Sequence, residues 1–392
     1  MNTQPHSRVD IADVLRGFAV MGIILLHSIE HFNYYFFPET FPFEWMKFTD
    51  TAIWDGMFFA FSGKAYAVFA LLFGFSFYIQ DDNQRRRGKD FRLRFLWRLM
   101  WLFLIGQVNA CFFTGEILTM YAVLGLILPL CCRLNNRALL IIAIILLIQP
   151  IDLANLFYGL VSPERPMGRS LGDYYFGLAY QVQGTGSFLE TVRMNLTVGQ
   201  LANFWWSFEH GRLTQTAGLF LLGLWIGRKE LFVWSENYEN SWLKTLGYSL
   251  VAFFPLYGLY LMIPDFVTTT SIQQPLTQWL YAMKNLSFTA MLVSGLWMVF
   301  YRVKDRTFLM RFAPYGKMSM TNYLWQSIMG SALFYHWGLN LGVYMTKTYS
   351  FLFGIAFVLL QLWFCTWWLR HHSHGIFEGF WRKMTWLGSG RS

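Results

Sequence analysis

The sequence predicts an all-α integral membrane protein, a bundle of about ten transmembrane helices with both termini in the cytoplasm. Of its 392 residues, 55% are hydrophobic and 20% aromatic, and only 14% are charged. A soluble domain usually has fewer apolar and more charged residues. The apolar residues also fall into runs of roughly 20, the length of helix that crosses a bilayer. Clusters of Lys and Arg separate alternate runs, as is typical of loops that face the cytoplasm.

The expected spans are joined by two kinds of loop. Basic loops follow the second and eighth spans, with the sequences DDNQRRRGKDFRLR and YRVKDRTFLMR, whereas the opposite loops are poor in Lys and Arg. We therefore predict a bacterial cytoplasmic (inner) membrane protein with one membrane domain over residues 1–392, an outer-side loop region at 159–211 and a cytoplasmic tail at 370–392. The ten spans are expected near residues 13–33, 54–79, 93–113, 117–132, 138–158, 212–228, 243–263, 280–301, 317–336 and 348–369.

Three features of the sequence argue against other classes of protein. They are the start of the chain, its net charge and its cysteines. The apolar run follows the first few residues directly and lacks a small-residue cleavage pattern, so the first span is expected to stay as a signal anchor. The net charge of +9 comes from clusters that flank the spans, which argues against nucleic-acid binding and leaves the lipid bilayer as the expected partner. The four cysteines show no CxxC spacing, so neither a disulfide framework nor a thiolate metal site is expected.

The first span has five ionisable residues, an unusual number for a helix in lipid. Because charged groups are costly there, they usually face a cavity or a partner. Arg16 and His27 are eleven residues apart and lie on nearly one face of a helix, separated by roughly 16 Å along its axis. We expect Arg16 near the cytoplasmic surface and His27, the best base in the segment, in the outer half of the span. The five residues are Asp13, Arg16, His27, Glu30 and His31.

Structural and metal-binding interpretations compete for the same residues. Arg16 can extend to the interface with Asp13 paired to it, while Glu30 and His31 lie at the outer surface. In addition, HSIEH at 27–31 fits the H-x-x-E-H spacing of a zinc-protease motif, with two imidazoles one turn apart. A zinc site needs a third protein ligand, which is not evident later in the sequence, so no metal is expected.

Further polar residues fall at membrane depth in the later spans. Lys64 lies near the middle of the second expected span, where it would bind an anion in a cavity or pair with Asp55 or Glu30. Glu116 is expected at an outer turn, where a solvated loop carboxylate is the simpler interpretation. Interhelical hydrogen bonding explains the polar stripe of the ninth span as well as function does. The candidate cavity-lining residues are Asp13, His31, Asn109, Glu116, Lys317, Asn322, Tyr323 and Gln326.

Five sequence blocks occur in order between residue 10 and about residue 387. They are DVLRGFAVMGIIL, GKAYAVFALLFGFSF, GEILTMYAVLG, GKMSMTNYLWQS and GIFEGFWRKMTW. Together they resemble the YeiB-like membrane proteins, a family with a domain of unknown function that is similar to the transmembrane acyltransferases. That wider group includes bacterial O-acyltransferases of surface sugars and the lysosomal enzyme that acetylates heparan glucosamine. The segment 133–211 has little of the resemblance.

The resemblance implies roles for two residues of the first span. The wider group shares an arginine-glycine pair on the first helix and a polar residue eleven positions after the arginine, and Arg16, Gly17 and His27 match these positions. That polar residue is histidine in the O-acyltransferases and asparagine in many YeiB-like proteins, so this chain departs toward the catalytic form. Conversely, Asn109 stands where YeiB-like chains usually have histidine, and Glu116 where they usually have aspartate.

The resemblance and the residues of the first helix together predict a membrane acyltransferase. Acetyl-CoA or another acyl-CoA would be the donor on the cytoplasmic side, bound by Arg16 and Lys64. His27 would remove a proton from an acceptor hydroxyl or amine that arrives from the outer side, with Glu30 orienting it. Lys64 or Asn322 would stabilise the oxyanion. The acceptor class is open between a small molecule, a lipid and a glycan.

Two other classes of function are compatible with the sequence. An ion-coupled transporter or permease would use the intramembrane His, Lys and Glu residues as proton relays or substrate contacts. A membrane-organising or signalling protein would use the same residues only to pack its helices. The small residues in the second and ninth spans fit the contacts of a homodimer and internal packing equally well.

Overall fold

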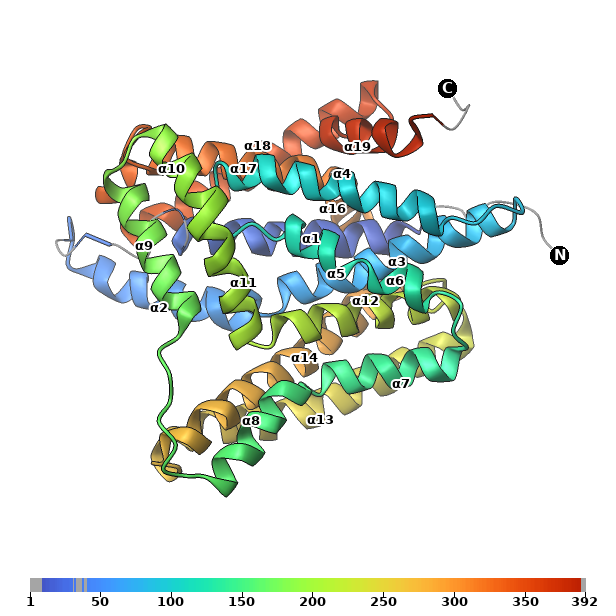
Figure 1. Ribbon diagram of the computed structural model, residues 1–392. Helices are drawn as coiled ribbons and strands as arrows, with labels where there is room; N and C mark the ends of the chain where they lie inside the picture. Colours follow the sequence, from blue (N-terminus) through green and yellow to red (C-terminus); the bar gives the residue numbers. More distant parts are fainter. Residues whose placement is uncertain (1–8, 31, 33–36, 39–40, 389–392) are drawn as a thin grey trace.

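The computed structural model of the chain describes residues 9–388 apart from 31, 33–36 and 39–40, and all the secondary-structure elements in this part are helices (Figure 1). The predicted all-α class is confirmed for these residues. In chain order the elements are α1 (Asp10–Ile29), α2 (Trp45–Phe61), α3 (Ala65–Arg85), α4 (Arg92–Ala110), α5 (Leu118–Leu124), α6 (Ile127–Cys131), α7 (Asn136–Leu147), α8 (Pro150–Val161), α9 (Leu171–Thr185), α10 (Phe188–Met194), the π-helix η1 (Asn195–Gly199), α11 (Gln200–Glu209), α12 (Arg212–Arg228), α13 (Glu236–Phe266), α14 (Thr270–Arg302), α15 (Thr307–Met310), α16 (Phe312–Lys317), α17 (Ser319–Phe334), the 3-10 helix η2 (Leu341–Val343), α18 (Lys347–His371) and α19 (Ile376–Trp386).

Each of the ten expected spans falls on helical structure, but fewer segments meet the length and hydropathy of a complete membrane crossing. Among the described residues, five do so, and the bent pair α7 and α8, which meet at 48°, makes a sixth if it counts as one span. Ten spans and cytoplasmic termini therefore stay predictions. The five segments are Asp10–Ile29, Trp45–Arg85, Glu236–Phe266, Thr270–Arg302 and Lys347–His371.

Two helices, α2 and α3, replace the single helix expected over 54–79. The chain turns at Gly63, whose φ of 76° lies in the left-handed region that other residues rarely adopt. Asn285 of α14 occupies the space where a Cβ on Gly63 would stand. Lys64 follows as the N-cap residue of α3, so it lies at a helix break rather than within a continuous span.

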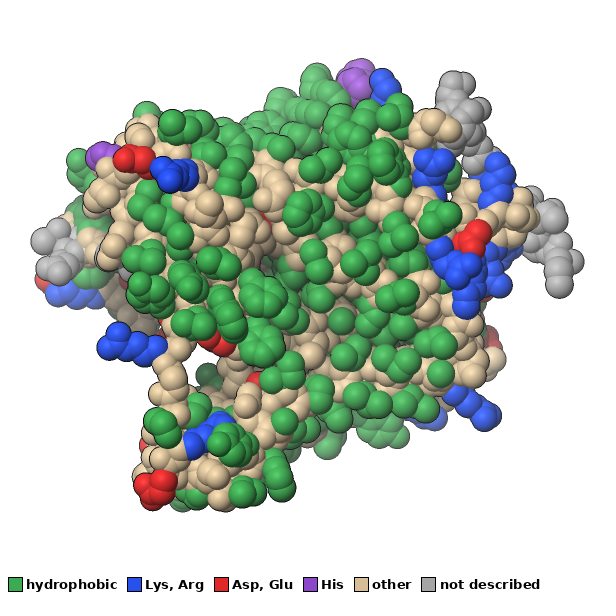
Figure 2. Space-filling view, viewed as in Figure 1, with side chains coloured by type: hydrophobic (Ala, Val, Ile, Leu, Met, Phe, Trp, Pro, Cys, Tyr) green, Lys and Arg blue, Asp and Glu red, His purple; other side chains and the backbone are tan. Residues whose placement is uncertain are grey.

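The segment 159–211, expected as a polar outer loop region, folds largely as α9, α10, η1 and α11. These helices lie across one end of the bundle (Figure 1). At the other end α3 finishes and α4 begins, and Lys and Arg side chains gather there (Figure 2). The tail region after 370 contains the short helix α19, which packs on α4 and α17.

Helix α1 lies at the centre of the bundle. In the most apolar 18-residue stretch of α1, 72% is buried, compared with 28% for the same length of α18 and 11% for that of α13. α1 packs against α3, α16, α17 and α18, and apolar side chains are spread over much of the face shown in Figure 2. Such an apolar surface suits contact with lipid, while the polar residues of α1 lie inside the protein, where other protein groups can pair with them.

Two glycines let α1 and α16 cross at very short distance. A Cβ on Gly17 would overlap the carbonyl oxygen of Phe312, and a Cβ on Gly316 would overlap that of Asp13. The glycine of the arginine-glycine pair therefore has a packing role. It brings α16 against α1 beside Arg16. The Arg16 side chain extends from a different face of α1, toward the cavity described below.

Replacing Gly316 by alanine is expected to destabilise the protein by about 1–3 kcal/mol, because the added methyl meets backbone, which cannot rotate away. The measurement is the apparent melting temperature of the purified protein. The control is Gly247→Ala in α13, where a Cβ meets nothing within 4 Å and alanine favours the helix. Equal melting temperatures for Gly316→Ala and the wild type would contradict the close crossing.

Candidate active site

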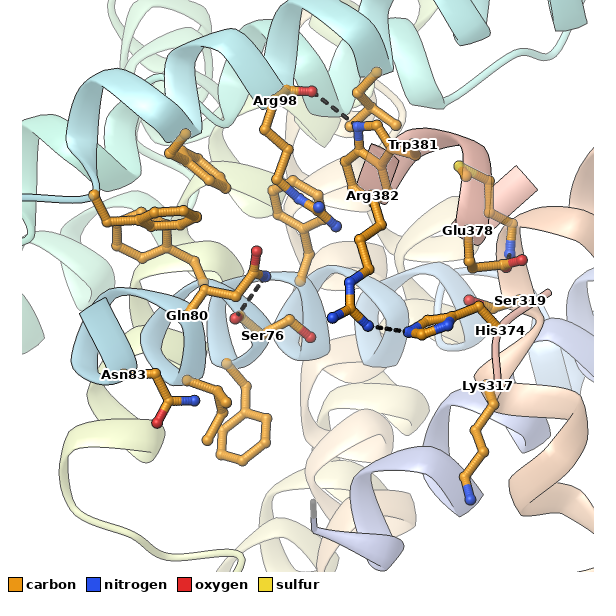
Figure 3. Close-up of a pocket in the computed structure, with 18 of the residues that line it drawn as sticks. Ser76, Gln80, Asn83, Arg98, Lys317, Ser319, His374, Glu378, Trp381 and Arg382 are labelled. Atoms are coloured by element: carbon orange, nitrogen blue, oxygen red, sulfur yellow. Dashed lines mark hydrogen bonds between the residues drawn. The ribbon is translucent and has the colours of Figure 1, made fainter. Parts of the chain in front are cut away.

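A cavity of about 1440 Å³ opens among α1, α3, α4, α17 and α19 (Figure 3). Its volume exceeds the range of about 300–1,000 Å³ that is usual for small-molecule sites, so it has room for a long ligand. The inner wall is apolar and aromatic, with Phe69, Phe73, Leu118 and Tyr121. Polar and charged residues line the part nearer the basic end of the bundle.

The cavity is strongly positive. Six Lys or Arg side chains line it, and two carboxylates accompany them. Figure 3 shows Arg382 reaching from α19 toward His374, to which its guanidinium is hydrogen-bonded. An excess of cations in a concave, partly apolar site attracts anionic ligands. The charged residues are Arg16, Arg87, Arg98, Lys317, Arg382 and Lys383, with Asp13 and Glu378.

Arg16 lies on the α1 wall of this cavity between two partners. Its guanidinium forms an ion pair with Asp13, at 3.0 Å, and donates to the Ser76 hydroxyl of α3, at 2.9 Å. Asp13 is buried, whereas 19% of the Arg16 side chain is accessible. The pair therefore keeps the guanidinium oriented and leaves part of it facing the cavity, so that a bound anion can reach it.

Helix α19 forms the wall opposite α1 and is attached to two helices. On α4, the Arg98 guanidinium stacks on the Trp381 ring at 3.4 Å from its centroid, and the Trp381 indole N–H donates to the Arg98 carbonyl. On α17, the Glu378 carboxylate accepts from the backbone N–H groups of Met320 and Thr321, at 2.7 and 3.0 Å. A negative group at these N–H groups suits the positive end of α17, so Glu378 fixes α19 over the cavity.

Glu378→Gln is expected to gain stability relative to the wild type as the pH rises. Burial raises the pKa of Glu378, although hydrogen bonds from Thr321 and Met320 oppose this shift. The folded state therefore binds a proton more readily than the unfolded chain, and the wild type loses stability between the unfolded pKa, about 4.3, and the higher folded pKa. Gln cannot titrate but keeps an acceptor oxygen.

The measurement compares melting temperatures of both proteins across this pH range. The exposed loop variant Glu164→Gln serves as the matched control and is expected to show a much weaker pH dependence. A difference between Glu378→Gln and the wild type that does not change with pH would contradict the assignment.

His27 lies farther along α1 and does not line this cavity. Its ring packs on Phe113 at 4.9 Å between centroids and lies 6.5 Å from the ring of Tyr323. Its Nδ1 is 3.2 Å from the side-chain Nε2 of Gln326 on α17. The side chain is partly exposed, so a proton acceptor is held here between α1, α17 and the turn after α4.

The side-chain amide of Gln326 lies against Nδ1 of His27, so its orientation can set which ring nitrogen carries the proton. In the orientation described, Oε1 of Gln326 is buried and has no hydrogen-bond partner. Rotating the amide by half a turn places Oε1 against Nδ1, where it accepts from Nδ1–H and is satisfied. Neutral His27 then has its lone pair on Nε2, which is the nitrogen that can act as a base.

Glu116 is fully buried at the start of α5 and is not the solvated loop carboxylate of the simpler interpretation. Its carboxylate accepts from the backbone N–H groups of Leu118 and Thr119, at 2.5 and 2.8 Å. The neighbouring Ile117 N–H donates to the Tyr323 hydroxyl at 3.2 Å. Asn109, also buried, lies beside the Glu116 carboxylate. This network holds the turn that separates the cavity from His27.

Two other candidates, Lys64 and Asn322, lie apart from both sites. The Lys64 ammonium donates to the carbonyl oxygens of Phe59 and Phe58, at 2.6 and 3.3 Å. The Asn322 amide donates to the Tyr315 carbonyl at 3.1 Å, in a buried network that includes Cys365. Neither lines the cavity, so their positions give no support to donor binding by Lys64 or to oxyanion stabilisation by Asn322.

The end of α1 is only partly described. Glu30 is the buried C-cap residue of α1, and its backbone N–H donates to the carbonyls of His27 and Leu26. His31 lies outside the described residues, and so does the geometry of the H-x-x-E-H motif. Among the residues that are described, no group of three or more His, Cys, Asp or Glu side chains could hold a metal ion.

Sequence reasoning missed the contribution of α19 and α4 to the cavity. His374, Arg382 and Lys383 come from the region expected as a cytoplasmic tail, and Arg98 comes from a span. A signal was present in the block GIFEGFWRKMTW, whose aromatic residues recur at helical spacing with basic residues between them. Such a pattern predicts a helix that lies on the protein or the membrane surface.

Two family models match different parts of the chain. Residues 8–163, which contain α1 and the first wall of the cavity, match the family described as heparan-alpha-glucosaminide N-acetyltransferase, catalytic. Residues 226–388, which contain α17 and α19, match the family described as protein of unknown function (DUF418). No solved structure matches the chain.

Relatives that match nearly the whole chain include two bacterial proteins. The uncharacterized protein YxaH of Bacillus subtilis (strain 168) is 28% identical over 98% of this chain and 96% of its own length. The uncharacterized protein YeiB of Escherichia coli (strain K12) is 26% identical over 96% of both chains. The protein is therefore an integral membrane protein related to the transmembrane acyltransferases. More narrowly, it is similar over nearly its whole length to YeiB and YxaH, and its C-terminal part matches the DUF418 family.

Proposed function

We propose that the protein is a membrane acyltransferase that takes an acyl group from a cytoplasmic acyl-CoA and passes it to a hydroxyl or amine that arrives from the outer side. The observation that supports this most is the pairing of two sites on α1. Arg16 lines a large positive cavity, and His27 lies three turns farther along the same helix, roughly 16 Å away. This region also falls within the match to an acetyltransferase catalytic domain.

The cavity suits the donor by charge and size. CoA carries several phosphate charges, and guanidinium groups form paired hydrogen bonds with phosphate oxygens. Arg16 would bind the donor on the α1 side, with Lys317 and the basic residues of α19 on the other. The extended arm of CoA would then run along α1 toward His27. Leu118 and Tyr121 form the inner wall, so this passage requires the wall to move.

His27 would act as the general base and then as the general acid. Its Nε2 removes the proton of the acceptor hydroxyl or amine as the acceptor oxygen or nitrogen attacks the thioester carbonyl carbon. A new C–O or C–N bond forms, the C–S bond breaks, and the leaving thiolate of CoA takes the proton from His27. Gln326 is a positioning residue in this scheme, because its amide oxygen, once turned toward Nδ1, would keep the proton of neutral His27 there.

The test is binding of acetyl-CoA and CoA to the detergent-purified protein by calorimetry, followed by transfer of a labelled acetyl group to a panel of hydroxyl and amine acceptors. Binding of both ligands and acetyl transfer to at least one acceptor are expected. Absence of binding across several acyl-CoAs of different chain length would overturn the proposal.

A transporter is a second candidate, favoured by one observation. The helix breaks between α2 and α3 and between α7 and α8 resemble the discontinuous helices of transporters, and Lys64 lies buried at the first break. Uptake of a solute into proteoliposomes that depends on a proton gradient would support this function. Acyl transfer without such uptake would exclude it.

A further inference from the structure

Three cationic side chains lie together inside the bundle, away from the cavity described above. They are Lys64 at the break between α2 and α3, Arg212 at the start of α12, and Lys284 near the middle of α14. Arg212 lies over the ring of Tyr66, two residues after Lys64, and Lys284 donates to Asn285, which packs beside Gly63, the residue before Lys64. Lys64 is 2% exposed and Lys284 6%, whereas Arg212 is partly exposed.

Contacts between the three elements hold this cationic cluster together. The Ser62 hydroxyl of the break is hydrogen-bonded to the Tyr281 hydroxyl of α14, at 3.0 Å. The Gln215 amide of α12 reaches the Ala282 carbonyl of α14 at 3.5 Å. The Lys64 ammonium is 5.2 Å from the ring centre of Phe288, one turn along α14 from Lys284. The cluster is therefore part of the packed interior.

Aromatic rings, rather than carboxylates, surround the cations. The Lys284 ammonium lies over Tyr260 and Tyr281, each at 4.6 Å, and the Arg212 guanidinium lies over Tyr66 at 3.9 Å. Within the described residues, none of the three forms an ion pair with Asp or Glu. Cation–π contacts offset part of the desolvation cost, but they do not remove the mutual repulsion of three positive charges.

Asn285 supplies an independent observation at the same place. Its side chain is 2% exposed and packs beside Gly63, next to the break. Its Oδ1 accepts from the Lys284 ammonium at 3.4 Å, while its Nδ2 has no hydrogen-bond partner. A buried N–H donor without an acceptor is costly, so the group that is missing here is an acceptor.

Arg212 is the member of the cluster nearest the surface, since it is partly exposed whereas Lys64 and Lys284 are buried. The surface is hollowed between the α9–α11 region and α8, beside the junction of α11 and α12 (Figure 2). Arg212 is the first residue of α12 at this junction. A ligand that enters there would meet the guanidinium first and the two ammonium groups deeper in the protein.

We propose that the cationic cluster of Lys64, Arg212 and Lys284 binds a phosphate group, either free or on a lipid. The cluster offers charged donors and the Asn285 N–H. A phosphomonoester has close to two negative charges at neutral pH and three strong acceptor oxygens, which matches three cations better than a single carboxylate does. This site goes beyond the proposed acyl transfer, since neither the donor cavity nor His27 is part of it.

The test uses the full-length protein in two forms with two probes. Inorganic phosphate is added to delipidated protein in detergent, and protein in nanodiscs with phosphatidic acid is compared with protein in phosphatidylcholine. Melting temperature is measured in each case, with phosphate affinity from its concentration dependence. Stabilisation by inorganic phosphate identifies free phosphate as the ligand, and stabilisation by phosphatidic acid alone identifies a lipid headgroup.

Lys284→Met is expected to reduce the affinity for the stabilising probe at least tenfold, because charged hydrogen bonds to phosphate are lost. Without any probe, the same variant is expected to melt at a higher temperature than the wild type, since one repelling charge is gone. Lys284→Arg keeps the charge and is expected to retain binding. Lys244→Met, which removes an exposed lysine of α13, is the matched control and is expected to bind like the wild type.

Several outcomes would overturn this proposal. One is a wild type that neither probe stabilises, and another is probe binding by Lys284→Met equal to that of the wild type. If Lys284→Met does not fold, Arg212→Gln at the partly exposed edge replaces it, with the same loss of binding expected. Acetyl-CoA binding in the basic cavity is measured in parallel and is expected to be unchanged, so failure of one site is distinguished from failure of the other.

Discussion

His27→Gln is expected to lower the rate of acyl transfer by a factor of about 10²–10⁴ while leaving the affinity for acetyl-CoA unchanged. Glutamine has a similar size and can still form a hydrogen bond with Gln326, but it cannot take a proton from the acceptor. Because His27 does not line the basic cavity, donor binding should not change. The measurements are single-turnover transfer rates and calorimetric dissociation constants on the same preparations.

His336→Gln is the matched control, since it removes an exposed histidine and is expected to keep the full transfer rate. Gln326→Leu tests the positioning role of Gln326 separately from the catalytic role of His27. It removes the oxygen that would hold Nδ1–H, so a smaller loss of kcat with an unchanged KM for the donor is expected. Full turnover by His27→Gln would remove the catalytic role, whatever Gln326→Leu does.

The positions of the helices could be predicted because membrane spans have a length and composition that are visible locally. The breaks could not be predicted as readily. Gln149, between α7 and α8, has a φ of 59° and its side-chain oxygen accepts from the Thr214 hydroxyl of α12. Pro150 gave a sequence signal for this bend, since proline disfavours helical geometry in the residue before it. At Gly63 the partner is Asn285, more than 200 residues away, and only the folded chain shows the contact.

Part of the candidate site could likewise be predicted from the sequence, and part could not. Arg16 and His27 could be related from the sequence, because their spacing places them on one helix face. The cavity could not, since its opposite wall comes from α19, which contacts α4 and α17 through Trp381 and Glu378. The cationic cluster could not be predicted either, because its members are far apart in the sequence and come from three helices.

Glu116 illustrates how a local motif can be misjudged. A carboxylate at the start of a helix is usually solvated, and its hydrogen bonds to Leu118 and Thr119 are the ordinary ones for such a position. Its complete burial comes from Tyr323 of α17 and Asn203 of α11, which cover the turn. The polar stripe of α17 likewise has two faces, because Gln326 meets His27 whereas Asn322 faces Tyr315 and Cys365.

Arg16→Ala is expected to bind acetyl-CoA about 10- to 100-fold more weakly than the wild type, the effect of losing one charged hydrogen bond. Two changes act in the same direction. The guanidinium that faces the cavity is gone, and the Asp13 carboxylate, which is 3% exposed, loses its ion-pair partner and repels the phosphates of the donor. Calorimetry on the folded variant, at low and high salt, gives the affinity and shows how far salt screens the attraction between the protein and the donor phosphates.

Asp13→Asn tests the opposite change in charge at the same ion pair. This variant keeps Arg16 and removes the negative charge beside it, so acetyl-CoA is expected to bind at least as tightly as to the wild type. Arg302→Gln removes an arginine that pairs with Glu239 outside the cavity and is expected to have no effect on binding. Equal weakening of binding by Arg16→Ala and Arg302→Gln would mean that the net charge of this end of the protein, rather than Arg16, attracts the donor. Opposite signs for Arg16→Ala and Asp13→Asn, with no effect of Arg302→Gln, would instead place the phosphates of the donor at this ion pair.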